Sequence, residues 1–431
     1  MIKVLRTEEE IRGFRENLKK RSTDPDFAVE RTVRTIINEV KTGGDEAVKS
    51  YTLRLDCDEA PYYRVPDEVI ARCLEEADDE FISSLKRCAY NIAAFHEKQM
   101  DEGFCVTEKN GVIVGQRVRP LDKVGIYVPG GTAAYPSSVL MTAIPAKTAG
   151  VGEIIMVTPP RKNGTPNPDI MAAAKLCGVD KVFLCGGAQA VAALAYGTAE
   201  IPKVAKIVGP GNVYVTMAKK LLFGLVDIDM IAGPSEILII ADKTANPSYI
   251  AADLLSQAEH DVLASSVLIT DSDEIAAKTA RELEKQLEEL PRKGMIKSSL
   301  INYGAAIVVG NMDEAVALTE EIAPEHCEVL AENPLEYIGR LNNIGSLFLG
   351  EYSPEPLGDY FAGPNHVLPT NGTARFFSPL GVDSFYKKSG YVYYPESALK
   401  AAAKDVALIA GREDLTAHAN AVKIRIKEGL F

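Results

Sequence analysis

The stretch MIAGPSEILIIADKTANPSYIAADLLSQAEHD, residues 230–261, decides the fold of this chain. Its apolar run Glu236–Ala241, closed by Asp242, predicts a strand buried on both faces of a parallel sheet. Asn246 and Pro247 then predict the start of a helix, because asparagine caps helix N-termini and proline fits the first helical turn. A strand followed directly by a helix indicates an α/β domain.

The end of this predicted helix carries two polar residues. Gln257 and His260 are three positions apart, so they share one face of the helix and could bind one ligand together. A capping histidine beside a surface glutamine would give the same pattern. The position of the other histidines is needed to choose between these interpretations.

Composition limits the class of protein. The chain has 431 residues, 46% hydrophobic and 25% charged, which is typical of globular proteins of two or three domains. A net charge of -13 argues against nucleic acid and anionic membranes as partners, because phosphate groups bind basic surfaces. Without an apolar run of spanning length or a signal-peptide core, we expect a cytoplasmic location. Seven cysteines without a CxxC pair indicate reduced thiols and no thiolate zinc site.

The two ends of the chain differ from its centre. Residues 1–25 are a charged arm without a long apolar face, and residues 381–431 are a tail too short to bury its own core. Both are expected to pack on something else. After the arm, residues 26–41 predict a helix that Gly43 and Gly44 end. His96 lies outside any glycine-rich or polar segment and is expected on the surface of a helix.

Three glycine-rich turns each follow a predicted strand. The strands 124–128, 181–185 and 204–208 lead into turns at 129–132, 186–189 and 209–212. Ligands of open α/β sheets bind beyond strand ends, and helix N-termini favour phosphate, so the turns predict a nucleotide site. None has the GxGxxG pattern, and tight turns without a ligand are the alternative.

Later segments add further polar groups. Glu325 and His326 are adjacent, and a histidine beside a carboxylate is a candidate general base near neutral pH. Asp359 and His366 lie in one glycine-rich loop, and His418 lies in the tail. Four of the five histidines therefore lie in polar or glycine-bearing segments. A sulfur-free set of nitrogen and oxygen ligands suits an open metal site, but spacing alone does not select its members.

Several of these segments together resemble the histidinol dehydrogenase family. They are AGPSE at 232–236, LSQAEHD at 255–261, PEH at 324–326, GDYFAGPNH at 358–366 and His418. The similarity covers nearly the whole chain. The long motifs are specific because each combines unusual residues in a fixed order, whereas the glycine turns alone are not. Cys327 departs from the pattern, in which we expect an aliphatic residue.

The resemblance implies an enzyme that oxidises L-histidinol to L-histidine through the aldehyde by two hydride transfers to NAD. One Zn²⁺ per subunit would be held by Gln257, His260, Asp359 and His418. The substrate would contact these four residues and also Ser235, His326 and Glu413. The implied NAD contacts are Tyr127, Gln189 and Asn212. His326 would be the base of the alcohol step, and Glu325 would activate water for the aldehyde step.

The resemblance also implies an α/β fold of two incomplete Rossmann-like parallel-sheet domains, the second inserted in the first. An N-terminal arm and a helical C-terminal tail would be exchanged within a homodimer. The expected boundaries are 1–25 for the arm, 26–126 and 237–380 for the first domain, 127–236 for the second, NAD-binding domain, and 381–431 for the tail. The zinc and catalytic residues would lie mainly in 237–380.

The sequence leaves three rival classes of protein open. A related zinc and NAD dehydrogenase of a sulfonated diol would need a cationic partner for the sulfonate, and Glu413 and His418 speak against it. A metal hydrolase or lyase would need zinc-activated water and would not use the turns near Tyr127, Gln189 and Asn212. A binding module without catalysis is a third class.

Overall fold

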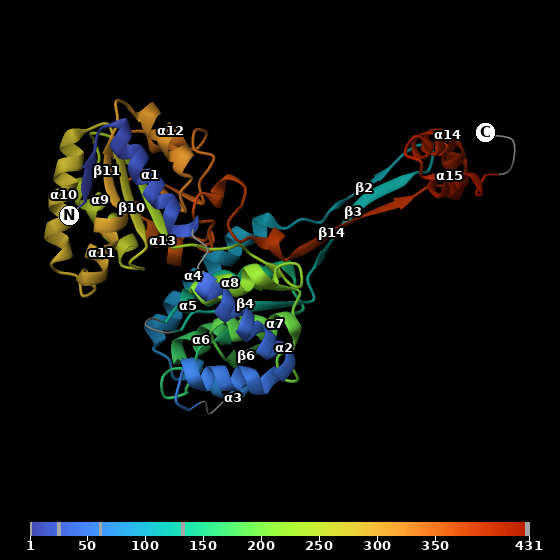
Figure 1. Ribbon diagram of the computed structural model, residues 1–431, viewed down its shortest axis with the longest axis horizontal. Coiled ribbons are helices and arrows are strands. Elements are labelled where there is room, and N and C mark those ends of the chain that lie inside the picture. The colour runs from blue at the N-terminus through green and yellow to red at the C-terminus, as the bar shows by residue number, and fades with distance from the viewer. Residues whose placement is uncertain (1, 24–26, 60–62, 131–133, 427–431) are drawn as a thin grey trace. The chain divides into compact units, whose positions relative to one another are not determined.

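The protein is represented by a computed structural model that describes residues 2–23, 27–59, 63–130 and 134–426 (Figure 1). One compact unit consists of Met1–Gln99 with Leu121–Phe385, and a second consists of Met100–Pro120 with Tyr386–Phe431. The predicted helix start at Asp26 and the turn residues Gly131 and Thr132 lie outside the described residues. Within the described ranges, no helix is both long and apolar enough to cross a membrane.

A six-stranded sheet forms one half of the first unit, and all its strands are parallel. In spatial order they are β1 (Lys3–Leu5), β11 (Gly304–Val308), β10 (Ser265–Thr270), β9 (Glu236–Ala241), β12 (His326–Leu330) and β13 (Ser346–Leu349). One face packs on α9 (Pro247–Ala258), α10 (Asp273–Leu287) and α11 (Lys293–Tyr303). The other face packs on α1 (Glu8–Thr23) and α12 (Met312–Ile322). Figure 1 shows α9, α10 and α11 beside this sheet.

The predicted strand at 236–241 is confirmed, and so is the helix after it, although that helix ends at Ala258 and His260 lies just beyond it. Ile237 and Ile239 of β9 pack in the core on the α9 side, and Leu238 packs in the core on the opposite side. Side chains alternate across a strand, so burial of both sets requires cover on both faces. At the start of α9, the Asn246 side chain accepts the N–H of Ser248.

The N-terminal arm lies on this sheet of its own chain. Lys3–Leu5 forms β1 and pairs with β11, which extends the sheet by one edge strand. This strand is not predictable from the sequence, because three residues are too few to show an alternating pattern. Exchange of the arm with a second subunit, which the family resemblance implied, stays a prediction.

The five-stranded sheet forms the other half of the first unit and is also parallel. Its spatial order is β6 (Lys181–Leu184), β5 (Glu153–Thr158), β4 (Lys123–Tyr127), β7 (Lys206–Val208) and β8 (Asp227–Ile228). Its helices are α5 (Pro136–Ala149), α6 (Pro168–Leu176), α7 (Gly187–Tyr196) and α8 (Val213–Leu222). These strands lie in sequence between β1 and β9. The predicted pair of Rossmann-like parallel sheets, the second inserted in the first, is therefore confirmed.

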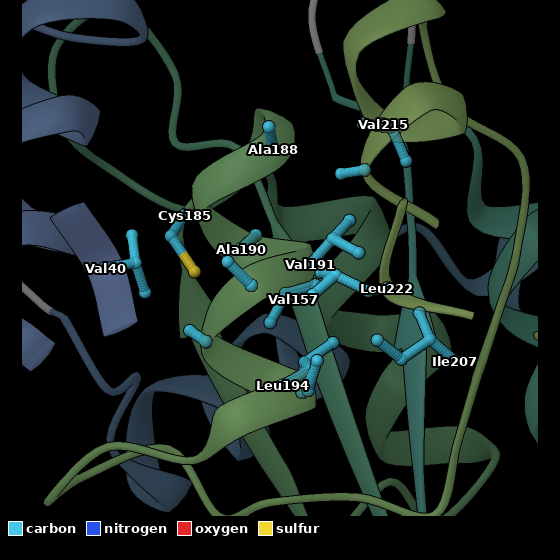
Figure 2. Packing of buried hydrophobic residues seen from close by; sticks show 14 of the residues in the cluster. Val40, Val157, Cys185, Ala188, Ala190, Val191, Leu194, Ile207, Val215 and Leu222 are labelled. Carbon is cyan, nitrogen blue, oxygen red and sulfur yellow. The ribbon is translucent and has the colours of Figure 1, made fainter. Parts of the chain in front are cut away.

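The N-terminal helices belong with the five-stranded sheet. They are α2 (Phe27–Leu55), α3 (Asp67–Glu75) and α4 (Asp79–His96), and they pack on α7 and α8, on α6 and on α5 respectively. Figure 2 shows Val40 of α2 in the same buried cluster as Cys185, Ala190 and Leu194. Residues 26–126 were expected to belong to the domain of the six-stranded sheet. The contacts of these helices and the place of β4 correct that assignment.

The second unit is built on an antiparallel sheet. It consists of β14 (Tyr386–Tyr393), β3 (Ile113–Pro120) and β2 (Phe104–Thr107), followed by α14 (Glu396–Arg412) and α15 (Thr416–Lys423). The two helices meet through a small alanine cluster. The expected tail is thus not only helical, because its first strand pairs along its whole length with β3. Residues 100–120 accordingly pack with the tail.

His96 is buried, which corrects its prediction as a surface residue. The last residue of α4, it has 0% exposure, and its Nδ1 donates to the Ile92 carbonyl at 2.8 Å. The amide nitrogen of Asn365 lies 3.4 Å from His96 Nε2, which fits a neutral ring that donates at Nδ1 and accepts at Nε2. Burial lowers the pKa of His96 and favours that neutral form. The ring thus supports the loop that leads to His366.

Candidate active site

The predicted catalytic residues lie where the strands of the six-stranded sheet begin, at its amino-terminal end. Glu236 is the first residue of β9 and His326 is the first residue of β12, the neighbouring strand. The strand order reverses here, because β10, β11 and β1 extend from β9 on one side and β13 extends from β12 on the other. The half-buried Ser235 directly precedes β9. Because α9 connects two parallel strands, β9 and β10, it runs antiparallel to them, and its C-terminal end also lies at the amino-terminal end of the strands.

The backbone of Glu236 holds both catalytic candidates. Its N–H donates to Glu325 Oε2 at 2.8 Å, and its carbonyl accepts from His326 Nδ1 at 3.0 Å. The proton of a neutral His326 ring is therefore on Nδ1, and Nε2 carries a free lone pair. His326 is buried, and its Nε2 has no hydrogen-bond partner among the described residues. The geometry presents Nε2 as a base.

The side chain of Glu236 is fixed by the N-terminal arm. Arg21 of α1 forms a buried ion pair with the Glu236 carboxylate, and its guanidinium also donates to the Leu263 carbonyl at 2.7 Å. A buried charge needs such a partner, because removal from water is costly. This role of Arg21 was not predicted, since nothing in the sequence of a charged helix shows which arginine turns inward.

Three of the four predicted metal ligands lie beside His326. Gln257 is in the last turn of α9, His260 follows the end of that helix by two residues, and Asp359 comes from α13 (Glu355–Tyr360). His260, Glu355 and Asp359 each offer a ligand atom, and these atoms lie within 4.8 Å of one another. Gln257 is 1% exposed, and its Oε1 has no hydrogen-bond partner in the described part of the chain. These nitrogen and oxygen donors fit Zn²⁺.

Glu355 was not predicted from the sequence. It is 1% exposed and lies four residues before Asp359, so both carboxyl groups share one face of α13. Its Oε1 and Asp359 Oδ1 are each 3.8 Å from His326 Nε2. The spacing was the only available signal, and the neighbouring prolines and glycines concealed this short helix. His366 adds a hydrogen bond from its Nδ1 to the Asp359 carbonyl at 3.1 Å.

Burial and charge shift the acid–base properties of the site. Burial raises the pKa of Glu325 to about 8 and that of Glu355 to about 8. Burial alone would lower the pKa of His326, but the Glu325, Asp359 and Glu355 carboxylates outweigh it and raise that pKa to about 10. Burial lowers the pKa of His260 and so favours the neutral imidazole that a metal requires. Three carboxyl groups around His326 suit a site that binds positive charge.

The predicted nucleotide contacts meet at one pocket. Tyr127 ends β4, Gln189 lies in the first turn of α7, and Asn212 caps α8 through the N–H groups of the next turn. The order of the five-stranded sheet reverses between β4 and β7, the place where ligands of such sheets bind. The Tyr127 hydroxyl accepts from the Gly187 N–H at 3.1 Å, and Gln189 Nε2 donates to Asp56 at 3.4 Å. Asp56 was not predicted.

Two predicted residues belong to the second unit. Glu413 directly follows α14 and His418 lies in α15, and both are solvent-exposed. The first unit therefore brings together, at the amino-terminal end of the six-stranded sheet, six predicted residues: Ser235, Gln257, His260, Glu325, His326 and Asp359.

Comparison with known proteins identifies the family. The model of the histidinol dehydrogenase family matches residues 18–426. The chain belongs to the histidinol dehydrogenase family. Histidinol dehydrogenase of Clostridium acetobutylicum is 54% identical over 96% of both chains, and that of Listeria innocua is 55% identical over 92% of both. The crystal structure of histidinol dehydrogenase from Elizabethkingia anophelis covers 99% of this chain and 98% of its own, with a TM-score of 0.92 and 37% identity. As a member of the histidinol dehydrogenase family, which is NAD-dependent, the protein is an oxidoreductase.

Proposed function

We propose that this protein oxidises L-histidinol to L-histidine through L-histidinaldehyde, with two successive hydride transfers and one zinc ion per subunit of a homodimer. The observation that carries the proposal is the buried His326, whose Nδ1 is held by Glu236 and whose Nε2 is unpartnered among the described residues. With the ring proton fixed on Nδ1, Nε2 can accept a second proton once positive charge bound in the site offsets the carboxylates that raise the pKa of His326. The names of the relatives support the substrate.

In the first oxidation, His326 Nε2 takes the proton of the alcohol oxygen while a hydride leaves the carbinol carbon. When bound, NAD supplies the hydride acceptor, and zinc supplies a positive centre for the imidazole and amino nitrogens of the substrate. The carboxylates of Glu355 and Asp359, 3.8 Å from Nε2, stabilise the imidazolium that forms. Ser235 and Glu413 contact the substrate in this proposal.

In the second oxidation, Glu325 acts as the base that activates water. Its buried carboxyl group has a pKa of about 8, and the N–H of Glu236 orients Oε2. Addition of water gives the aldehyde hydrate, whose C–H bond loses the second hydride to give the carboxylate. The overall reaction converts one alcohol, one water and two NAD into one carboxylate, two NADH and three protons. Retention of the aldehyde in the site protects a reactive intermediate.

The ligand set proposed for zinc is Gln257, His260, Asp359 and His418. The first three come from adjacent elements of the first unit, and the orphaned Gln257 Oε1 supports the set. His418 lies on the tail, and we propose that the tail completes the site of the partner subunit. Zinc would orient the substrate rather than activate water, and correct orientation alone can supply several kcal/mol of the barrier reduction.

Tyr127, Gln189 and Asn212 are proposed to contact NAD. Their support is the shared pocket at the reversal of strand order in the five-stranded sheet. This pocket has no use in a zinc hydrolase or lyase. The alternative of a sulfonated-diol dehydrogenase gains no support from the relatives, which are named histidinol dehydrogenase at 53% to 55% identity.

The test is NADH absorbance with L-histidinol as the only organic substrate. We expect two NADH per histidinol, and no NADH from a His326→Asn variant that keeps the Nδ1-side hydrogen bond. Gel filtration of both proteins should give the same dimeric volume, so that a folding defect is not mistaken for loss of the base. Turnover of a sulfonated diol without turnover of histidinol would contradict the proposal.

A further inference from the structure

Two carboxyl groups, one buried and one half-buried, lie behind the active site, at the point where three of its elements meet. Glu328 of β12 is 2% exposed, and Asp253 of α9 is half-buried. Glu328 Oε1 accepts the backbone N–H of Glu355, the first residue of α13, at 2.7 Å. The carboxyl groups of Glu328 and Asp253 lie within hydrogen-bonding distance of each other. Neither residue is among those implied by the family resemblance.

Such a contact requires a proton between the two groups. Two carboxylates at this distance in a buried place would repel, and each lacks a hydrogen-bond donor toward the other. Among the described residues, no lysine or arginine is named with the groups that act on the pKa of Asp253 or Glu328. Glu328 Oε2 has no other hydrogen-bond partner among the described residues. Burial raises the pKa of both groups, which agrees with one shared proton at neutral pH.

Asp253, Glu328 and Glu355 each lie on the same face of their helix or strand as a residue of the active site. Asp253 precedes the proposed ligand Gln257 by four residues of α9, and Glu355 precedes Asp359 by four residues of α13, so each pair shares a helix face. Glu328 follows His326 by two residues of β12, so these side chains point to the same face of the sheet. Each of the three residues is therefore separated from an active-site residue by one helical turn or by two residues of a strand.

We propose that Asp253 and Glu328 form an acid–carboxylate pair that positions the active site by tying α9, β12 and α13 together. Glu328 accepts the amide of Glu355 with one oxygen and shares a proton with Asp253 through the other. The pair sets Gln257 and His260 against Asp359 and keeps all of them at a fixed place relative to His326. The inference deepens the proposed function, because it rests on the zinc site formed by these helices.

Amide substitutions separate a shared proton from a pair of charges. In Glu328→Gln, the amide oxygen still accepts from Glu355 and the amide nitrogen donates to an ionised Asp253. In Asp253→Asn, the new amide donates to an ionised Glu328. Glu328→Leu has similar bulk and loses both hydrogen bonds. Val329→Ala is the matched control, since it opens a cavity on the opposite face of the same strand without touching the pair.

The experiment measures zinc affinity of the full-length protein by competition with a chelator, together with thermal unfolding of each variant. Glu328→Leu should bind zinc at least tenfold more weakly, the effect usual for residues that support metal ligands. Glu328→Gln and Asp253→Asn should stay within about threefold of the unsubstituted protein. Val329→Ala should unfold at a lower temperature with unchanged zinc affinity. The proposal is overturned if Glu328→Gln weakens zinc binding as much as Glu328→Leu, or if Glu328→Leu changes only the unfolding temperature.

Infrared spectroscopy gives a readout that does not depend on zinc. At neutral pH, the difference spectrum between the unsubstituted protein and Glu328→Gln should contain the carbonyl band of a protonated carboxylic acid. Its absence would overturn the shared proton. If the unsubstituted protein binds no zinc but shows this band, the proposed metal site fails while the pair stands, so the two proposals fail in distinguishable ways.

Discussion

Glu325→Gln tests the division of labour between the two catalytic residues. Glutamine has the same shape and can still accept the Glu236 N–H that Glu325 accepts at 2.8 Å, so the position of His326 should be retained. What the substitution removes is the carboxylate that takes a proton from water. General base catalysis contributes a factor of about 10² to 10⁴, so aldehyde oxidation should slow by about that factor. Alcohol oxidation, which uses His326, should change by less than about tenfold.

The pH dependence supplies a second signature with a definite sign. Burial raises the pKa of Glu325 to about 8, and the ionised form is the active base. Aldehyde oxidation by the unsubstituted enzyme should therefore rise as the pH increases through about 8. Glu325→Gln should not show this rise.

The assay follows NADH with L-histidinol and, separately, with L-histidinaldehyde as substrate. Glu332→Gln, the same change at an exposed position just beyond β12, serves as the matched control and should behave like the unsubstituted enzyme. Glu325→Gln should release about one NADH quickly per histidinol and the second slowly. Equal slowing of both oxidations, or a stoichiometry of one with the unsubstituted enzyme, would refute the assignment of Glu325 to the aldehyde step.

The remaining predictions concern the metal, the tail and the buried histidine. Metal analysis should find about one zinc per chain, and His260→Ala should lose it, whereas full metal retention in an inactive variant would remove His260 from the ligand set. His326→Ala and His418→Ala, each inactive alone, should regain roughly a quarter of the activity when refolded together, because half the dimers would be mixed with one intact site each; no recovery would show that the tail serves its own chain. Burial lowers the pKa of His96, so the folded state should lose stability below about pH 6.5 as the unfolded chain takes up the proton, by at most about 1.4 kcal/mol per pH unit. Unfolding measured against pH should show this slope reduced in His96→Gln, and an unchanged slope would mean that His96 is not kept neutral.

Sequence was sufficient where the determining interactions are local. The apolar run of β9 and the Asn246 cap of α9 act within a few residues, and the structure has both where they were expected. The family motifs identified His260, His326 and Asp359 as candidate site residues, and the fold brings them together at the amino-terminal end of the six-stranded sheet. The choice of elements was thus well determined.

Sequence was insufficient where long-range packing decides. The apolar stripe of α2 shows that one face is buried but not which sheet covers it, and the structure pairs α2 with the five-stranded sheet. His96 has the local sequence of a surface residue, yet α4 ends against the loop that contains Asn365. Glu355 acquires its place only when α13 meets β12. Each of these depends on partners far away in the sequence.

Glu236 holds Glu325 and His326 through hydrogen bonds of its main-chain N–H and carbonyl alone. Substitution of the Glu236 side chain would leave the buried Arg21 without its partner, but the main-chain N–H and carbonyl would remain, so the alignment of the two strands is what positions Glu325 and His326. A slip of β12 by one residue against β9 would turn His326 toward the opposite face of the sheet and bring Cys327 into its place. Insertions or deletions inside either strand should therefore abolish turnover even where every catalytic side chain is retained, and proline at 236 should do so by deleting one donor. For anyone who redesigns this enzyme, strand length is the quantity to preserve.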